Sequence, residues 1–161
     1  MIKTLRFRDQ GFDQSSSYTS SHEGGWVQAA YEQVQRDFAS AESLDAPALR
    51  EFVNTYAECS RGNWDGYDAL PVSGRTYSRA RSFLEQCLAR VPAPVATATP
   101  SGSIAFEWCL ARDRRLMVSI GDEDEIAFAG LFSGNSVHGT ELFFGDVPPS
   151  VWNLLNRLFR R

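Results

Sequence analysis

The sequence contains few of the side chains that carry catalytic chemistry. Its 161 residues include three cysteines, two histidines and one lysine. Cys59, Cys87 and Cys109 are odd in number and form no C-x-x-C pair, so the sequence predicts neither a disulfide framework nor a zinc module. Free, half-buried thiols in a reducing cytoplasm fit this pattern better. The G-x-S-x-G, H-E-x-x-H and P-loop signatures are also absent, so an enzyme is not favoured.

Long apolar runs are missing as well. The opening MIKTLRFRDQ has no apolar h-region of the kind found in signal peptides. No run approaches the roughly 20 apolar residues that cross a bilayer. We therefore expect a soluble, cytoplasmic protein without membrane association.

Positive charge is too sparse for a surface that reads nucleic acid. The net charge is −4, and each end of the chain carries three basic residues with no acid among them. Recognition of nucleic acid needs a basic face, so nucleic acid is not favoured as a partner, apart from weak binding at those ends. The four acids at 122–125 are too few to indicate a nucleic-acid mimic. We expect both ends and this acidic turn to be solvated.

The rest of the composition is typical of one folded domain. Apolar residues make up 43% of the chain and aromatic residues 12%, which is enough for a single core. Residues 1–25 are predicted to form a short basic start and a mobile polar segment rich in serine and glycine. Residues 26–161 are predicted to form a single α+β domain, helical over 26–91, with a sheet over 95–145 and a C-terminal helix over 147–160.

Helical periodicity fills the first half of this domain. One apolar stripe runs over 26–40. A second helix is predicted to have Asp45 as its N-cap, Pro47 in its first turn and a hydrophobic staple between Leu44 and Leu49, and to stop at Gly62. Its inward side chains are predicted to be Leu49, Phe52, Val53, Tyr56 and Ala57.

Two further helices carry equally clear signals. Ser73 or Ser78 can cap the third, which the prolines of VPAP terminate at 91–94. Its inward face is predicted to be Tyr77, Ala80, Leu84, Cys87, Leu88 and Val91. The last helix is predicted to be capped by Asp146, with Pro148 and Pro149 in its first turn. Its buried face is predicted to be Val151, Leu154, Leu155, Leu158 and Phe159.

Between these helices the hydrophobic period is two. Four alternating runs over 103–145 are joined by the short connections RDR, DED and SGN, so neighbouring strands must be antiparallel. We predict a meander of four to five strands packed by the third and last helices. In the first run Phe106, Trp108 and Leu110 alternate with Glu107 and Cys109. Glu107 is therefore expected to face away from the core, although Cys109 is expected to be a core residue rather than a nucleophile.

The most unusual stretch is NWDGYDALPVS at 63–73. Gly66 permits a positive φ, and Asp65 can accept a backbone N–H bond in an Asx-turn. Trp64 and Tyr67 are expected to fold back onto the core with their polar tips at the surface. Pro71 then fixes the approach to the next helix, so the stretch is predicted to be mainly structural.

Together with PSGSIAFEW at 100–108, this stretch resembles a group of small, uncharacterised bacterial proteins. Their shared pattern is an Asn-Trp-Asp-Gly-Tyr-x-Ala-x-Pro loop followed by a Gly-x-Ile-x-Phe/Leu-Glu-Trp strand. The resemblance covers about 63–150 and implies a fold and a bacterial or phage origin, but no activity and no functional residues. The pattern has glycine where this chain has Asp68. Because aspartate adopts left-handed backbone more readily than most residues, the turn is expected to survive.

Two functional hypotheses remain open. The first is a non-catalytic bacterial or phage interaction protein, such as an inhibitor, an immunity or antitoxin-like factor, or an adaptor. It would bind another protein, with no cofactor, no metal and no catalytic residue. Its candidate binding residues are Trp64, Asp65, Tyr67, Asp68 and Glu107. A homodimer through the sheet edge or the outer sheet face is also left open.

The alternative is a metal-dependent hydrolase. Asp65, Asp68 and Glu107 would supply the oxygen ligands that hard cations prefer. That hypothesis requires the three carboxylates to converge at a cleft. It fails if Asp65 bonds the backbone and Glu107 points elsewhere.

Overall fold

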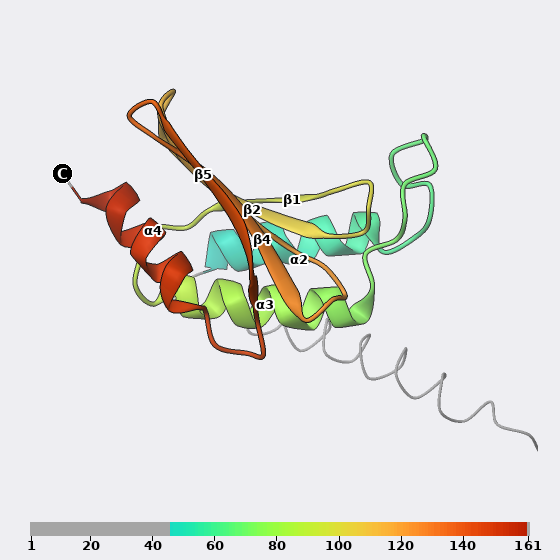
Figure 1. Ribbon diagram of the computed structural model, residues 1–161. Coiled ribbons are helices and arrows are strands. Elements are labelled where there is room, and N and C mark those ends of the chain that lie inside the picture. The colour runs from blue at the N-terminus through green and yellow to red at the C-terminus, as the bar shows by residue number, and fades with distance from the viewer. Residues whose placement is uncertain (1–45, 161) are drawn as a thin grey trace, which may run out of the picture.

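The computed structural model describes residues 46–160, and these form one sheet with helices on a single side (Figure 1). Helix α2 spans Ala46–Cys59, α3 spans Gly74–Leu88 and α4 spans Pro149–Phe159. The predicted α+β class is thereby confirmed. The expected basic start, polar segment and helix over 26–40 lie outside the described residues, as do Leu44 and Asp45 with their proposed staple and cap.

The sheet is an antiparallel meander in the order β1-β2-β3-β4-β5. Its strands are β1 Val95–Ala98, β2 Ile104–Ala111, β3 Arg114–Ile120, β4 Glu125–Phe132 and β5 Asn135–Leu142. The four strands predicted over 103–145 are present, and β1 is the fifth. The turn between β4 and β5 has positive φ at Ser133 (51°) and Gly134 (88°). These angles match a two-residue type I′ turn, which follows the twist of a hairpin.

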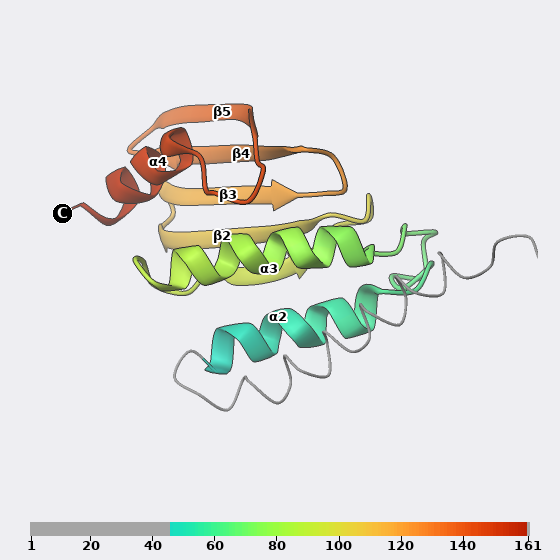
Figure 2. The same ribbon diagram turned by 90° about the horizontal axis from the view of Figure 1, so that it is seen from below.

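The helices cover only one face of the sheet. Helix α2 packs on β1, α3 on β2 and β3, and α4 on β3 and β4. Figure 2 shows α3 and α4 in front of the strands and α2 beside α3 at the β1 edge, and Figure 1 shows the opposite face without a covering element among the described residues. We call this second face the outer face. Alternate strand residues point toward the helices, and on β2 and β3 most of these residues are apolar and buried.

An aromatic cluster joins the helices to the inner face. The rings of Phe52 and Tyr77 stack at 5.1 Å between centroids, and those of Phe83 and Phe106 at 5.7 Å. All four residues are fully buried. Offset stacking of this kind contributes about 0.5–1.5 kcal/mol per pair beyond the burial of area. The cluster therefore ties α2 and α3 to β2.

The helix signals were right in most but not all details. Pro47 lies in the first turn of α2, and Ser73 caps α3 by accepting a hydrogen bond from the Thr76 N–H. Ser78 is inside α3 and is not its cap. Asp146 does not cap α4, since Pro148 occupies the cap position without a side-chain bond. Pro149 at the first helical position has no N–H, so it removes one of the backbone donors that lack a partner inside the helix.

Three predicted positions differ from the structure in burial or backbone. Ala57 is exposed rather than inward, and the buried Cys59 takes its place at the end of α2. Leu110 is 46% exposed, because the β2–β3 register shifts between Cys109 and Ala111 and breaks the alternation. The left-handed residue after α2 is Asn63 (φ 59°) rather than Gly62.

Candidate functional site

The segment over 63–71, here called the 63–71 loop, is held by its own side chains. One oxygen of Asp65 accepts hydrogen bonds from the N–H groups of Tyr67 (2.8 Å) and Ala69 (3.2 Å). The amide oxygen of Asn63 accepts from the Asp68 N–H at 3.0 Å. The predicted Asx-turn at Asp65 is thereby confirmed. Because these groups are satisfied inside the loop, its backbone is fixed without help from a ligand.

Backbone geometry and one indole complete this frame. Asn63, Gly66 and Asp68 have φ values of 59°, 78° and 65°, so the left-handed conformation expected at Gly66 and tolerated at Asp68 is present. The Trp64 indole N–H donates to the Leu70 carbonyl at 3.1 Å, and its ring packs against the core. Trp64 therefore folds back as predicted. It locks the end of the loop to its beginning.

A second turn supports the loop from outside. The Leu70 N–H donates to the Pro100 carbonyl at 2.9 Å. Gly102, with φ +81°, lies so close to the loop that a Cβ there would be 2.8 Å from the Pro71 carbonyl oxygen. The 63–71 loop and the turn at 99–103 are therefore in direct contact.

Tyr67 does not fold back onto the core, contrary to expectation. Its side chain is 89% exposed, the largest value among the exposed large apolar residues of the described chain. Leu70 in the same loop is 60% exposed. The bonds described above use the backbone of Tyr67 and leave its ring unused. The loop therefore presents an aromatic ring to solvent from a rigid frame.

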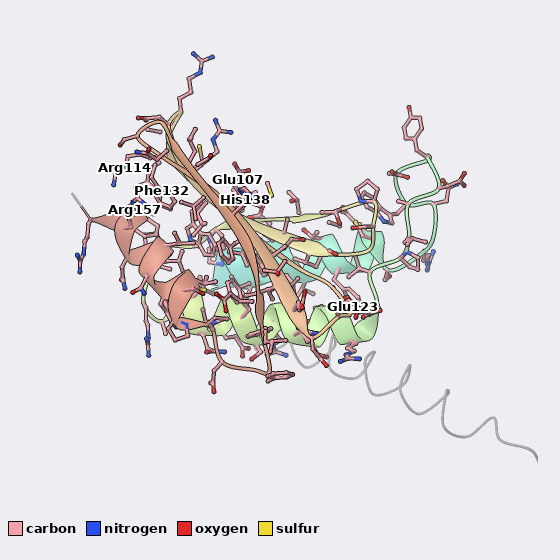
Figure 3. The ribbon with its side chains drawn as sticks, in the orientation of Figure 1. Glu107, Arg114, Glu123, Phe132, His138 and Arg157 are labelled. Atoms are coloured by element: carbon pink, nitrogen blue, oxygen red, sulfur yellow. The ribbon has the colours of Figure 1, made fainter. Side chains whose placement is uncertain are left out.

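Glu107 lies on a different surface. Its neighbours in β2, Phe106 and Trp108, are buried on the inner face, so Glu107 is on the outer face as predicted. Figure 3 shows Glu107 near the middle of the sheet, away from the 63–71 loop that extends beyond the end of α2. The five candidate binding residues are thus divided. Trp64 and Asp65 hold the loop, Tyr67 and Asp68 are exposed on it, and Glu107 is apart from all four.

This arrangement gives the carboxylate cluster no support. Asp65 bonds backbone N–H groups, and Glu107 lies on the outer face of the sheet. Within residues 46–160, no group of three or more histidine, cysteine, aspartate or glutamate side chains lies close enough to hold a metal ion. The three carboxylates therefore do not converge as the hydrolase hypothesis requires, and the two observations that count against it, the backbone bonds of Asp65 and the outward position of Glu107, are both present.

The acidic turn with the acids at 122–125 was expected to be solvated. The structure instead shows that two of these acids bond to α3. A carboxylate oxygen of Asp122 accepts hydrogen bonds from the hydroxyls of Ser73 and Thr76 at the start of α3. Asp124 forms an ion pair with Arg75 at 2.7 Å. Negative charge at a helix N-terminus is favourable, because the helix dipole is positive there. The acids thus attach the β3–β4 turn to α3.

Arg79 is the central group of this attachment. Its guanidinium donates to the carbonyls of Glu123 and Phe143, the latter at 3.2 Å, and approaches Asp124 at 3.5 Å. Only 13% of its side chain is exposed, and burial lowers the pKa of Arg79 despite the neighbouring acids. The residue binds two loops to one helix, a role that a periodicity pattern does not reveal.

An open pocket of about 310 Å³ lies at the opposite end of the sheet. Its lining includes Arg114, Phe132 and Arg157, which Figure 3 shows close together where α4 meets the strands. Arg114 donates to the carbonyls of Leu158 and Arg160, and so satisfies the C-terminal end of α4. The Arg157 guanidinium lies 4.6 Å from the centre of the Phe132 ring. These contacts give both arginines a structural role in holding α4 on the sheet.

The thiols and the described histidine offer no reactive pair. Cys59 and Cys87 are buried, and burial raises the pKa of Cys87 to about 12 and also raises the pKa of Cys59. Cys109 is exposed, so its assignment to the core was wrong. It alternates with Trp108 and therefore points to the outer face. His138 is exposed on β5, as expected, and His22 lies outside the described residues.

None of the helices in the described part of the chain is long and apolar enough to span a membrane. Comparison of the chain with protein-family models, with characterised proteins and with solved structures gave no match. The geometry of the molecule is therefore the basis for the function proposed below.

Proposed function

We propose that this chain is a non-catalytic interaction protein and that the tip of its 63–71 loop contacts the partner protein. The observation that supports this proposal is the 89% exposure of Tyr67 on a loop that the side chains of Asn63, Trp64 and Asp65 hold in place. A turn needs no exposed ring at this position. The ring is therefore free to serve recognition.

The chemistry of the tip suits protein binding. Tyrosine is enriched among the residues that dominate interface energies, since it buries a large ring and keeps a hydroxyl for a hydrogen bond. Leu70 adds exposed apolar area, and Asp68 adds an exposed carboxylate. Because the loop is already rigid, little conformational entropy is lost when it binds. A partner with an apolar pocket bordered by hydrogen-bonding or basic groups would fit.

The biological role within this class follows the sequence-based hypothesis. We propose an inhibitor, an immunity or antitoxin-like factor, or an adaptor of bacterial or phage origin. The bacterial or phage origin rests on the family resemblance of the 63–71 loop and the 100–108 stretch. The choice among these roles rests on the partner that the loop binds.

Photocrosslinking tests the proposed contact directly. A photoreactive phenylalanine analogue would replace Tyr67 in the full-length protein, expressed in the organism that encodes it. The matched control places the same analogue at Phe144, which is 76% exposed outside the loop. We expect one crosslinked partner from position 67 and not from position 144. Equal crosslinking at both positions, or none at position 67, would contradict the proposal.

A further inference from the structure

On its three central strands the outer face of the sheet carries three charged residues, Glu107, Arg115 and Glu125, of which Arg115 and Glu125 lie near the ends of their strands. In antiparallel sheets with one solvated face, the residues that point to solvent are normally polar. On the three central strands, however, this face carries small or apolar side chains at most positions: Ala105, Met117, Ser119, Ala127, Ala129 and Leu131. Met117 is 42% exposed, and Val95 at the edge is 54% exposed. Small and apolar side chains over the middle of a sheet face are typical of a surface that packs against another sheet.

We propose that the outer face packs against the outer face of a second copy of this chain, forming a two-fold symmetric dimer. This inference is independent of the proposed function, because it uses a different surface from the 63–71 loop. Five residues form one row of partners across the sheet. The row runs Val95, Glu107, Met117, Ala129 and His138, from β1 to β5.

The four residues of this row on β2 to β5 are two polar side chains on either side of two apolar ones. An acid and an imidazole lie at the two ends, and a large and a small apolar side chain lie between them. A two-fold axis that runs parallel to the strands between β3 and β4 would place β2 of one copy over β5 of the other. Glu107 would then face His138 of the second copy, and Met117 would face Ala129 of that copy. Glu107 lies on β2 and His138 on the edge strand β5, each partway along its strand.

The same axis also brings the next row into register. It would place Ala105 over Thr140 of the second copy, and Ser119 over Ala127 of that copy. All four side chains are small, so the two sheets can approach to the usual separation of about 10 Å. A carboxylate and an imidazole directly opposite each other can bridge that gap. A two-fold interface requires this kind of self-complementarity, because each contact occurs twice.

The area of the outer face limits how strongly two copies can associate through it. Four strands about 4.8 Å apart and seven residues long, at about 3.3 Å each, give a footprint on the order of 450 Å² before side-chain relief is added. Stable interfaces bury about 800 Å² on each partner, so this dimer falls in the weak class. We therefore expect an association that depends on concentration in the micromolar range.

Sedimentation equilibrium of the full-length protein, from about 1 to about 500 μM, covers the range expected for a weak interface. We expect the wild type to shift from monomer to dimer over this range. Glu107→Arg would face His138 twice in its dimer, and His138→Glu would face Glu107 twice, so each variant alone should be monomeric. An equimolar mixture of the two should form a dimer again, since the introduced arginine then faces the introduced glutamate and the native pair forms once. Glu51→Arg, an exposed position on α2, is the control and should behave as wild type.

Each other outcome would overturn the proposal. A wild type that stays monomeric throughout would mean that the outer face does not pair with a second copy. Dimers that persist in both single variants would place the interface elsewhere, for example along the free edge of β5. Monomeric variants whose mixture also stays monomeric would refute the pairing of Glu107 with His138. Circular dichroism of each variant establishes that it is folded before it is compared.

Discussion

Gly102 offers a sharp test of how the 63–71 loop is supported. Gly102→Ala adds one methyl group at a residue with φ +81°, and that methyl carbon would lie 2.8 Å from the Pro71 carbonyl oxygen. The contact is with backbone, so no flexible side chain can move away. Relief requires a shift of the loop, and such a shift would stretch the bond from the Leu70 N–H to the Pro100 carbonyl.

The expected cost has two parts. Left-handed backbone costs a non-glycine residue about 1–2 kcal/mol, partly offset by the 0.4–1 kcal/mol that alanine saves by restricting the unfolded chain. Overpacking adds about 1–3 kcal/mol. We therefore expect Gly102→Ala to lower the free energy of unfolding by about 2–4 kcal/mol, and the overpacking part reports the contact with the loop.

Gly66→Ala is the matched control. Gly66 has φ +78°, nearly the same conformation, but nothing lies within 4 Å of its added Cβ. Only the backbone part of the cost applies, so we expect a loss of about 1 kcal/mol or less. Urea unfolding followed by circular dichroism measures both variants, and a constant m-value would show that the unfolded states are comparable. Equal losses in the two variants would refute the close packing of the loop on the turn at 99–103.

The remaining predictions use the same unfolding assay or thiol chemistry. Arg79→Met should lower the free energy of unfolding by about 2–3 kcal/mol, because the carbonyls that it binds lose a charged donor; an unchanged value would mean that the acidic turn is held by other groups. Asp65→Ala should cost about 1–2 kcal/mol and Asp65→Asn clearly less, since asparagine keeps the accepting oxygen; equal losses would argue against the Asx-turn. With Ellman's reagent, Cys109 should react quickly while Cys59 and Cys87 react only on unfolding, and three fast thiols would contradict the burial. Because burial raises the pKa of Cys87 to about 12, its stabilising contribution is complete below about pH 9 and falls as the pH rises from about 9 to about 12; the alkaline loss of stability should be smaller in Cys87→Ala.

The architecture could be predicted from the sequence because its signals are local and repeated. A period of two with short polar connections allows only antiparallel neighbours, and the turn at Ser133 and Gly134 has the geometry that its residues favour. The Ser73 cap and the proline in the first turn of α2 are likewise short-range features. The outward direction of Glu107 followed from alternation alone.

The sequence predictions failed where long-range contacts decide the outcome. The acids at 122 and 124 resemble a solvated turn until Arg75 and the start of α3, almost fifty residues earlier, are placed beside them. Tyr67 resembles a core aromatic by type, but the bonds of Asp65 direct it outward. Cys109 was predicted to be a core residue because cysteine is usually buried. The structure shows it exposed, as the alternation of β2 would place it. In that case the strand pattern was the better guide.

We propose that this protein acts by binding another protein through the 63–71 loop. The most direct test is affinity capture of the tagged full-length protein from a lysate of the organism that encodes it, with quantitative mass spectrometry. Tyr67→Ala is compared with the wild type, and Phe144→Ala serves as the control for loss of an exposed ring. We predict a stoichiometric partner with the wild type and with Phe144→Ala, but not with Tyr67→Ala. Capture that is unchanged by Tyr67→Ala, or the absence of any partner, would contradict the claim.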